Sequence, residues 1–306
     1  MKKRILSILL ATAMTTLMLA GCGQKTAEAE KEVEKAADEI ETAVDDAAEE
    51  SAAPEVEEAE QEAAADEAAA TKRDKLIVGF DAEYPPYGFM DESGEYTGFD
   101  LEMAAALCEL NGWELVKTPI NWDSKDMELN SGAIDCVWNG FTINGREDLY
   151  TWSMPYVNNS QVILTSKDSG ITDFDGLAGK TVGVQAASAA LELLQNEEGR
   201  KDLADTFGTL QEFPDYNSAF VELQAGSVDA IAMDIGVAQY QINSRDEGYV
   251  ILEEILKAEQ YGVGFKLGNE ELCEEINKGL LELLDNGTFD ELAKKYEIED
   301  MVCLGE

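Results

Sequence analysis

The sequence predicts an α/β protein whose folded part is built from two similar lobes. From Lys75 onward, short runs rich in β-branched residues alternate with helical patterns, an order that is typical of α/β proteins. A unit made of a helix end, a glycine and a buried strand occurs twice at identical spacing. Near residue 71 the composition changes abruptly, which separates this part from an acidic N-terminal region.

Regular patterns predict the strands and helices of the folded part. The strands are expected at 76–80, 114–118, 134–138, 161–165, 181–185, 228–233 and 261–265. The helices are expected at 100–111, 124–131, 187–196, 218–225, 270–285 and 289–296. Asp100 is expected to cap the first of these helices, which stops at Asn111 before Gly112.

The repeat links residues 129–137 to residues 223–231, with a glycine and an aspartate at matching positions. Since helix–glycine–strand units are common, a chance match is the alternative to a true repeat. Ligands of open α/β sheets bind beyond the carboxyl ends of the strands. The residues just after the two matched strands are therefore candidates for a binding site. They are Asn139, Gly140, Thr142 and Asp234.

The overall charge excludes several classes of function. The chain has 22 Lys and Arg residues against 64 Asp and Glu residues, a formal net charge of −42, and it has no histidine. A surface this negative repels phosphate backbones, so nucleic-acid binding is not expected. Without histidine, Ser-His-Asp and Cys-His catalysis and zincin-type metal sites are excluded. No catalytic residue, metal or cofactor is therefore predicted.

Residues 1–22 are predicted to be an export signal that ends in a lipid attachment site. Three basic residues precede an apolar run at 5–19, which is short for a membrane span and typical of a secretory signal. The run ends in Leu-Ala-Gly-Cys, the order of a bacterial lipobox, so Cys22 is expected to carry a diacylglycerol anchor. An ordinary cleaved signal with an incidental cysteine is the alternative.

Residues 23–74 are predicted to be a disordered, acidic tether rich in Ala and Glu. Between positions 23 and 70 the chain has 16 alanines, 18 acidic residues and no aromatic residue. Such a segment cannot bury enough apolar surface to offset its ordering entropy, although transient helix is expected. The tether would hold the folded part away from a bilayer.

The remaining cysteines give two expectations. Cys108 and Cys136 fall in a helix and a strand, where small buried apolar residues are the usual interpretation. Cys273 and Cys303 lie in the C-terminal helical region and could form a disulfide outside the cytoplasm. The sequence leaves that pairing open.

Six motifs follow one another in the folded part. They are DAEYPPYGF (81–89), GFDL (98–101), DCVWNGFTINGR (135–146), WSMPY (152–156), LAGKTVGV (177–184) and GSVDAIAMD (226–234). Together they resemble the family 3 extracellular solute-binding proteins, the amino-acid receptors of ABC importers. The resemblance implies a two-lobed periplasmic-binding-protein-like (type II) fold with the ligand cleft between the lobes. It places lobe 1 at 75–161 and 259–306, and lobe 2 at 162–258.

The resemblance also implies how an amino acid would be held. A free amino acid is a zwitterion, so its cleft needs one fixed cation and one fixed anion. Arg146 offers a planar fork to the α-carboxylate, and Asp234 offers a carboxylate to the α-ammonium. The supporting groups are the hydroxyl and backbone N–H of Thr142, the carbonyl of Gly140, and the N–H groups of Ser188 and Ala189.

Four further residues are expected around the ligand side chain. Tyr84 and Trp122 are candidate aromatic walls, with ordinary core packing as the alternative, and Asp81 and Glu83 would lie near the side-chain end. The sequence departs from the family pattern at two places. The loop before Arg146 is one residue shorter, and 187–189 reads Ala-Ser-Ala where the family has Gly-Thr-Thr.

The expected function is a monomeric, lipid-anchored, extracytoplasmic receptor that closes around a polar amino acid and delivers it to the permease subunits of an ABC transporter. Glutamine, cystine, lysine and arginine are all compatible with the sequence, and the envelope could have one or two membranes. The alternative is an exported dehydratase-like enzyme on the same scaffold, with Glu83 as the obvious acid. A sensor ectodomain or an attached peptidoglycan lyase would need additional chain.

Overall fold

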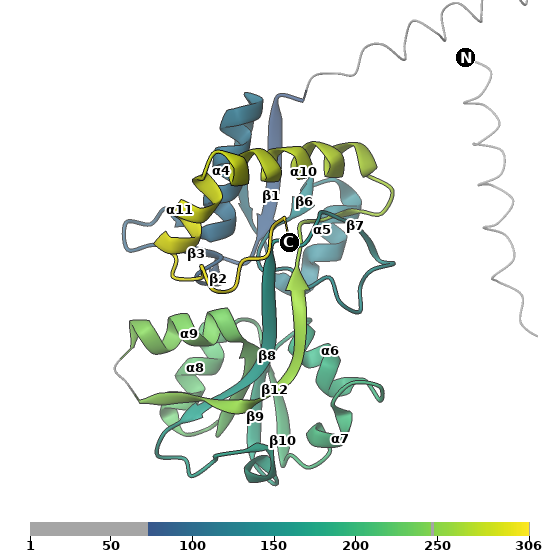
Figure 1. The fold of residues 1–306 in the computed structure, drawn as a ribbon. Helices are drawn as coiled ribbons and strands as arrows, with labels where there is room; N and C mark the ends of the chain where they lie inside the picture. The colour runs from purple at the N-terminus through teal and green to yellow at the C-terminus, as the bar shows by residue number, and fades with distance from the viewer. Residues whose placement is uncertain (1–72, 246–247, 306) are drawn as a thin grey trace, which may run out of the picture. The chain divides into compact units, whose positions relative to one another are not determined.

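The computed structural model describes residues 73–245 and 248–305, and it shows a two-lobed α/β fold (Figure 1). The predicted signal at 1–22, its Cys22 and the predicted tether up to residue 72 lie outside the described residues. Within the described part, no helix has the length and apolar character needed to cross a membrane.

Lobe 1 is built on a five-stranded sheet in the order β5-β1-β6-β13-β7. Its strands are β1 Lys75–Phe80, β5 Glu114–Pro119, β6 Cys136–Val137, β7 Tyr150–Trp152 and β13 Gly264–Lys266. Its helices are α4 Phe99–Asn111, the 3-10 turn η1 Trp122–Ser124, α5 Lys125–Ser131, α10 Glu270–Asp285 and α11 Thr288–Lys295. A small sheet is formed by β2 Glu83–Tyr84, β3 Gly88–Met90 and β4 Tyr96–Thr97. The strand β1 is parallel to β5 and β6, whereas β13 is antiparallel to β6 and β7.

Lobe 2 is built on a second five-stranded sheet in the order β10-β9-β11-β8-β12. Its strands are β8 Val157–Ser166, β9 Thr181–Gln185, β10 Thr209–Phe213, β11 Ala230–Asp234 and β12 Tyr249–Tyr261. Its helices are the 3-10 turn η2 Phe174–Leu177, α6 Ala189–Gln195, α7 Lys201–Ala204, α8 Tyr216–Ala225 and α9 Ile235–Ser244. The strands β9, β10 and β11 are parallel, and β8 and β12 are antiparallel to their neighbours.

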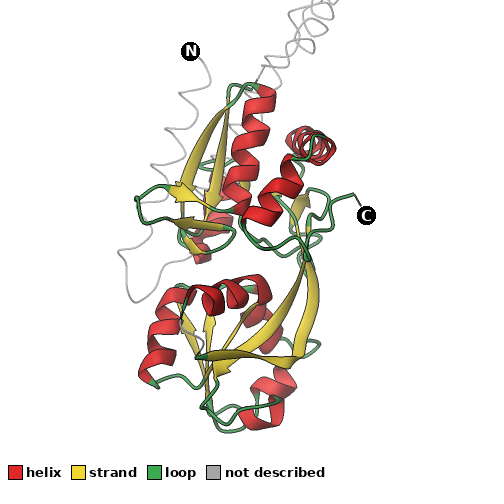
Figure 2. Ribbon diagram, turned by 60° about the vertical axis from the view of Figure 1, so that its left-hand side comes forward, coloured by secondary structure: helices red, strands yellow, loops and turns green. Residues whose placement is uncertain are grey.

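Two long strands connect the lobes. The strands β8 and β12 pair antiparallel from Ser166 with Tyr249 to Val157 with Tyr261, and Figure 2 shows them side by side as they run from one lobe to the other. Their register shifts between Ile251 and Lys257, and such irregularities bend and twist a strand pair. The chain therefore passes between the lobes twice.

The repeat predicted from the sequence is confirmed in the two lobes. The helices α5 and α8 both end at a glycine in the left-handed conformation, Gly132 with φ 79° and Gly226 with φ 73°, which favours glycine because it has no Cβ. Asp135 then accepts a hydrogen bond from the backbone of β1, and Asp229 accepts one from the backbone of β9, at 2.7 and 2.8 Å.

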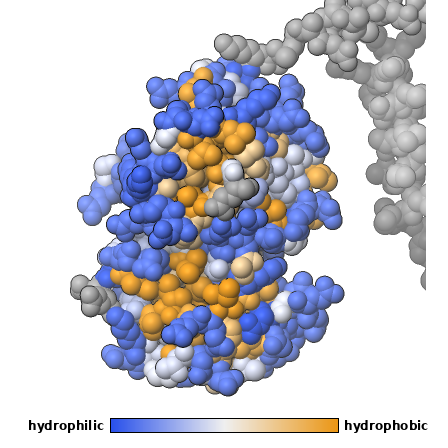
Figure 3. Space-filling model, in the orientation of Figure 1, coloured by the Kyte–Doolittle hydropathy of each residue, from blue (hydrophilic) through white to orange (hydrophobic). Residues whose placement is uncertain are grey.

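The hydrophobic core consists of three clusters. One cluster extends through both lobes and includes Tyr84 and Tyr87 from lobe 1 and Tyr216 from lobe 2. The other two clusters each belong to a single lobe, and successive residues of β8, such as Val162 and Ile163, face different clusters. Figure 3 shows hydrophilic residues around the edge of one face, with hydrophobic residues gathered toward the middle of each lobe.

The structure corrects several sequence predictions. The strand expected at 261–265 is instead the end of β12 and the start of β13, and the strand expected at 134–138 is limited to β6. The sequence patterns did not reveal the elements β2, β3, β4, β7, β10, α7 and α9 or most of β12. Asp100 does not cap its helix, because Gly98 is the N-cap residue. The buried carboxylate of Asp100 instead accepts from the backbone N–H of Gly140 and the hydroxyl of Tyr156.

Candidate functional site

A small pocket lies between the two lobes. Its lining is formed by Tyr84, Trp122, Gly140, Thr142, Arg146, Gln185, Ser188, Ala189 and Asp234. Eight of these nine residues were predicted from the sequence, and Gln185 was not. The open volume is about 10 Å³, close to the space needed for one water molecule. An amino acid would therefore need the lobes or the lining side chains to move apart before it could enter.

The cationic end of the pocket is formed by Arg146, whose side chain is almost fully buried. A turn places it, because its N–H donates to Ile143 and its carbonyl accepts from the indole of Trp152. Its Nε and Nη2 atoms donate to the two carboxylate oxygens of Glu192 at 3.0 and 2.8 Å. Glu192 belongs to lobe 2, so this bidentate ion pair joins the lobes. The same guanidinium fork is suited to the carboxylate of a ligand.

A second buried cation lies beside Arg146. Lys125 is 4% exposed, and its Nζ donates to the carbonyl of Trp122 in lobe 1 and to that of Ala187 in lobe 2. Burial, together with the nearby Arg146, lowers the pKa of Lys125 to about 8. Sequence reasoning missed this residue because a lysine at the start of a predicted helix is usually exposed. Lys125 thus adds a second contact between the lobes at the cationic end.

The anionic end of the pocket is formed by Asp234. This residue occupies the N-cap position of α9, yet its side chain makes no capping hydrogen bond. Its Oδ1 accepts from Asn159 Nδ2 and Gln161 Nε2 at 2.7 Å each, and from the Tyr261 hydroxyl at 2.6 Å. Burial raises the pKa of Asp234. The carboxylate is therefore held within the site by β8 and β12 and does not stabilise its own helix.

A second carboxylate, which sequence reasoning missed, lies next to Asp234. Glu259 comes from β12 and is 6% exposed. Its Oε1 accepts from Asn159 Nδ2 and Gln161 Nε2 at 2.7 Å each, and from the Thr142 hydroxyl at 2.8 Å. Burial and the neighbouring Asp234 raise the pKa of Glu259 to about 7. In the segment 249–261, charged residues interrupt the apolar ones, and no strand was predicted there before Tyr261, so the sequence pattern did not reveal this inward-facing acid.

A third group of acids lies at the edge of the pocket. Asp81 accepts from Gln185 Nε2 at 2.6 Å and from the backbone N–H of Glu83 at 2.9 Å. Burial, with Asp215 and Glu83 nearby, raises the pKa of Asp81 to about 6. The predicted Glu83 side chain is exposed and contacts Asn217 of lobe 2. In the described part of the chain, no Lys or Arg bonds to Asp81.

The remaining predicted residues are placed as follows. Asn139 does not line the pocket but supports its wall, because its Oδ1 accepts from the backbone N–H of Asp81. Ser188 is the N-cap of α6, where its hydroxyl accepts from Leu191 and its own N–H donates to Gln185. The expectation that this N–H points at a ligand is therefore not met in this conformation. Ala189 contributes to the pocket lining.

The two predicted aromatic walls belong to the pocket and to the core at once. Tyr84 packs against Tyr216 of lobe 2 with ring centroids 5.9 Å apart, and its hydroxyl lies 3.5 Å from that of Tyr261. Trp122 packs edge to face on Phe141 at 5.4 Å. Both side chains are more than nine-tenths buried. Their core-packing and wall interpretations are therefore compatible.

Comparison with known proteins assigns this architecture to a family. A profile of the bacterial extracellular solute-binding proteins, family 3, matches residues 76–299. The chain belongs to this family. It is 30% identical over 229 residues to the L-cystine-binding protein TcyJ of Escherichia coli (strain K12), covering 74% of this chain and 83% of that protein. It is 34% identical over 230 residues to the arginine-binding extracellular protein ArtP of Bacillus subtilis (strain 168), covering 73% and 86%.

Solved structures agree with this assignment. A substrate-binding protein of an ABC uptake transporter from Streptococcus pneumoniae, with bound histidine, aligns with a TM-score of 0.71 and 30% identity, covering 74% of this chain and 94% of that one. The ancestral amino acid-binding protein AncCDT-1, a precursor of cyclohexadienyl dehydratase, aligns with a TM-score of 0.66 and 30% identity, covering 72% and 95%. One structural neighbour is thus an ancestral binding protein that preceded an enzyme.

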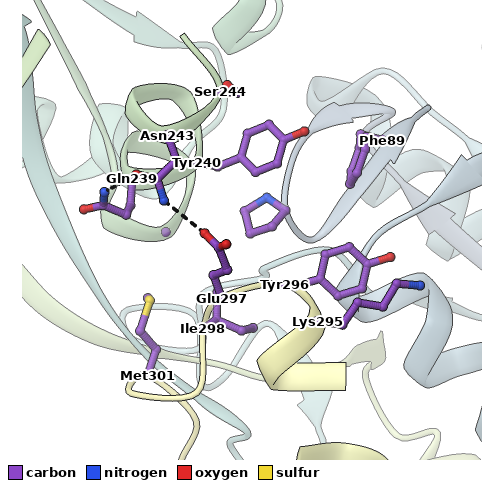
Figure 4. Close-up of a pocket in the computed structure, with 12 residues that line it drawn as sticks. Phe89, Gln239, Tyr240, Asn243, Ser244, Lys295, Tyr296, Glu297, Ile298 and Met301 are labelled. Atoms are coloured by element: carbon purple, nitrogen blue, oxygen red, sulfur yellow. Dashed lines mark hydrogen bonds between the residues drawn. The ribbon is translucent and has the colours of Figure 1, made fainter. Parts of the chain in front are cut away.

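A larger cavity of about 380 Å³ lies outside the pocket, between α9 and the C-terminal segment (Figure 4). It is lined by aromatic rings such as Tyr240 and Phe89, whose centroids are 5.7 Å apart. Asn243 of lobe 2 donates to Glu297 of lobe 1 across it at 3.2 Å. Its lining comes from both lobes, and none of the candidate site residues belongs to it.

The cysteines do not form a metal centre in the described residues, where no group of His, Cys, Asp and Glu is suited to hold a metal ion. Cys108 and Cys136 are buried, as expected. Cys273 is a free thiol whose Sγ donates to the carbonyl of Trp152 at 3.1 Å, so it forms no disulfide with Cys303.

Proposed function

We propose that this chain is the lipid-anchored extracellular receptor of an ABC importer, which binds a polar amino acid between its lobes and delivers it to the permease. The observation that carries this proposal is the placement of one buried cation, Arg146, and one buried anion, Asp234, in a single pocket between two lobes. A free amino acid carries the complementary pair of charges.

Each end of the pocket has a defined role in this proposal. Arg146 holds the α-carboxylate, which takes the place of the Glu192 carboxylate on the guanidinium fork. Asp234 holds the α-ammonium, with the carbonyl of Gly140 as a further acceptor, while Thr142 contacts the carboxylate. Ser188 and Ala189 lie close to the same carboxylate, and the N–H of Ser188 becomes available only if its turn opens.

The acids at the pocket edge favour a ligand with a positively charged side chain. Burial raises the pKa of Asp81, and the nearby acids Asp215 and Glu83 add to that rise. A guanidinium or ammonium at this place would remove that electrostatic cost. Among the relatives, ArtP is named for arginine and the Streptococcus pneumoniae neighbour holds histidine, which agree with this direction, whereas TcyJ is named for L-cystine. We therefore expect arginine and lysine to bind more tightly than glutamine or cystine.

The proposal extends to the parts of the chain outside the pocket. The lobes consist of 75–161 with 259–306 and of 162–258, and they rotate about β8 and β12. Cys22 carries the lipid anchor, and 23–74 acts as a spacer between the bilayer and the lobes. Two acyl chains or more would hold such a receptor firmly on the membrane.

A binding function is favoured over a dehydratase-like one. The AncCDT-1 neighbour shows that this fold lies close to enzymes. However, Glu83, the acid that the sequence suggested for such a reaction, is exposed, contacts Asn217 and does not line the pocket. Family 3 is a family of solute-binding proteins, which also supports a receptor.

A thermal-shift screen of the mature chain against the twenty amino acids and cystine tests the proposal. Binding stabilises the folded state by RT ln(1 + [L]/Kd), so about 2.7 kcal/mol is expected at a hundredfold excess over Kd. A matched control is Glu212→Gln, on an exposed position of β10, which should reproduce the wild-type shifts. If no amino acid raises the midpoint, the proposal is wrong.

A further inference from the structure

Two buried carboxylates in the pocket region share the same two hydrogen-bond donors. Asn159 Nδ2 and Gln161 Nε2 each lie 2.7 Å from an oxygen of Asp234 and 2.7 Å from an oxygen of Glu259. The two carboxylate oxygens therefore cannot be farther apart than twice that distance. They come from β11 and β12, so the sheet of lobe 2 fixes their approach.

No cation in the described residues bonds to this pair. Arg146, the cation that lines the same pocket, donates to Glu192. The hydroxyl of Tyr261 donates to Asp234, and the Tyr84, Tyr87 and Tyr216 side chains lie near it. Among the described residues, the side-chain hydrogen bonds that Glu259 accepts come from Thr142 and the two shared amides.

Glu259 also borders an outer groove. Charged side chains of that groove are Glu192, Glu198, Arg200 and Lys257. Arg200 is paired with Asp202, and Lys257 is exposed. Neither of these two cations bonds to Glu259, which keeps the amides and Thr142 as its partners.

Two ionised carboxylates this close in a buried place repel each other strongly, so one of them retains a proton. We propose that Asp234 and Glu259 share one proton in the absence of ligand, and that the ammonium group of the bound amino acid displaces it to the solvent. This inference rests on the proposed function. In this inference, Glu259 supplies a second negative charge for the ligand ammonium. The side-chain amides of Asn159 and Gln161 hold it beside Asp234.

The displacement has a defined sign. The incoming ammonium adds a positive charge beside the pair, so it favours the state in which both carboxylates are ionised. Binding then releases up to one proton, and affinity must rise with pH as long as the free pair is protonated. Burial and Asp234 raise the pKa of Glu259 to about 7. The increase of affinity with pH is therefore expected below about pH 7. Its upper limit is about tenfold in Kd for each pH unit.

Two other buried acids titrate in the same range and must be separated from the pair. Burial raises the pKa of Asp81 to about 6 and that of Asp100, beneath Gly140, to about 7. Both remain in a Glu259→Gln variant, which keeps the shape and one acceptor oxygen at position 259. Asp81→Asn is the matched variant, because it removes the acid of Asp81 and keeps the Asp234–Glu259 pair.

Calorimetry of the mature wild type with L-glutamine and with L-arginine, between pH 5.5 and 8.5, measures the linkage. We expect Kd for glutamine to fall about three- to tenfold per unit up to neutral pH. Titration in two buffers of different ionisation enthalpy should show proton release. In Glu259→Gln, Kd for glutamine should change less than about twofold per pH unit. In Asp81→Asn, the change of Kd for glutamine per pH unit should equal that of the wild type. Equal slopes in the wild type and in Glu259→Gln overturn the inference.

Carboxyl NMR of the wild type without ligand gives an independent test. The pair should titrate in two steps, with the upper step near neutral pH, and that step should disappear in Glu259→Gln. If both carboxylates ionise together at low pH, the shared proton does not exist, even where binding is normal. If no amino acid binds while the upper step is present, the proposed function fails and the shared proton stands.

Discussion

The two lobes use the same local frame but supply opposite charges to the pocket. In each lobe a left-handed glycine ends a helix and an aspartate bonds to the backbone of a neighbouring strand. Beyond this frame the two lobes differ. Lobe 1 continues through the turn at Gly140 to Arg146, whereas lobe 2 reaches Asp234 at the last position of β11. The frame thus determines where a side chain emerges, and the residues just beyond it determine the chemistry.

The two ends also differ in how their charges are satisfied. Arg146 has a carboxylate partner from the opposite lobe, while Asp234 has Glu259, a second acid, beside it. In the proposed function, a ligand exchanges one carboxylate for another at the cationic end. At the anionic end it supplies the first positive charge.

Removal of either charged end should have the largest effect. Arg146→Ala leaves Glu192 without its partner and the ligand carboxylate without a fork, and Asp234→Ala leaves the ligand ammonium with one acid fewer. Unpaired buried charges cost about 3–5 kcal/mol, so we expect each variant to weaken binding about a hundredfold or more. Calorimetry measures this, with Arg200→Ala as the control. A change of less than about threefold in both would remove the site assignment.

Disruption of the shared frame should affect stability in both lobes and leave the pocket chemistry intact. Asp135→Ala and Asp229→Ala each remove the acceptor of one backbone N–H, at Ile77 and at Thr181. We expect a loss of about 1–2 kcal/mol in each case, measured by urea unfolding, with Kd changed less than about threefold. A loss confined to one variant would show that the two frames are not equivalent in energy.

The smallest effect is expected at the ion pair that joins the lobes. Glu192 is 54% exposed, and pairs of this kind contribute about 0.2–1 kcal/mol. Because Glu192 competes with a ligand for Arg146, Glu192→Gln should tighten binding by up to about fivefold. Glu198→Gln, in the same groove, is the control and should leave Kd unchanged. Weaker binding in Glu192→Gln would mean that the pair holds the bound form closed.

Sequence reasoning succeeded where a local pattern carried the information. The repeat pointed to Asn139, Gly140, Thr142 and Asp234, because strand ends are marked by composition and by glycine. The last three line the pocket, and Asn139 lies behind its wall. The family motifs added Arg146, which no local pattern identifies as buried. The two-lobed α/β fold was predicted correctly for the same reasons.

Sequence reasoning failed where the hydrogen-bond partners of a residue come from distant parts of the chain. Glu259 and Lys125 look like ordinary surface charges, since only the packing of β12 and α5 against the opposite lobe buries them. Asp100 looks like a helix cap because the acid lies at a helix start. Its true partner, Gly140, is 40 residues away. Such long-range partners leave no trace in local periodicity.

The order of the strands has a consequence for the order in which the two lobes can fold. The strand β7 pairs only with β13 in its sheet, and β13 also pairs with β6, so lobe 1 cannot complete its sheet until Gly264–Lys266 arrive. Everything that lobe 2 needs lies between those two strands of lobe 1. As the chain is synthesised, lobe 2 can therefore complete its sheet first, and the sheet of lobe 1 stays incomplete until Gly264–Lys266 have emerged.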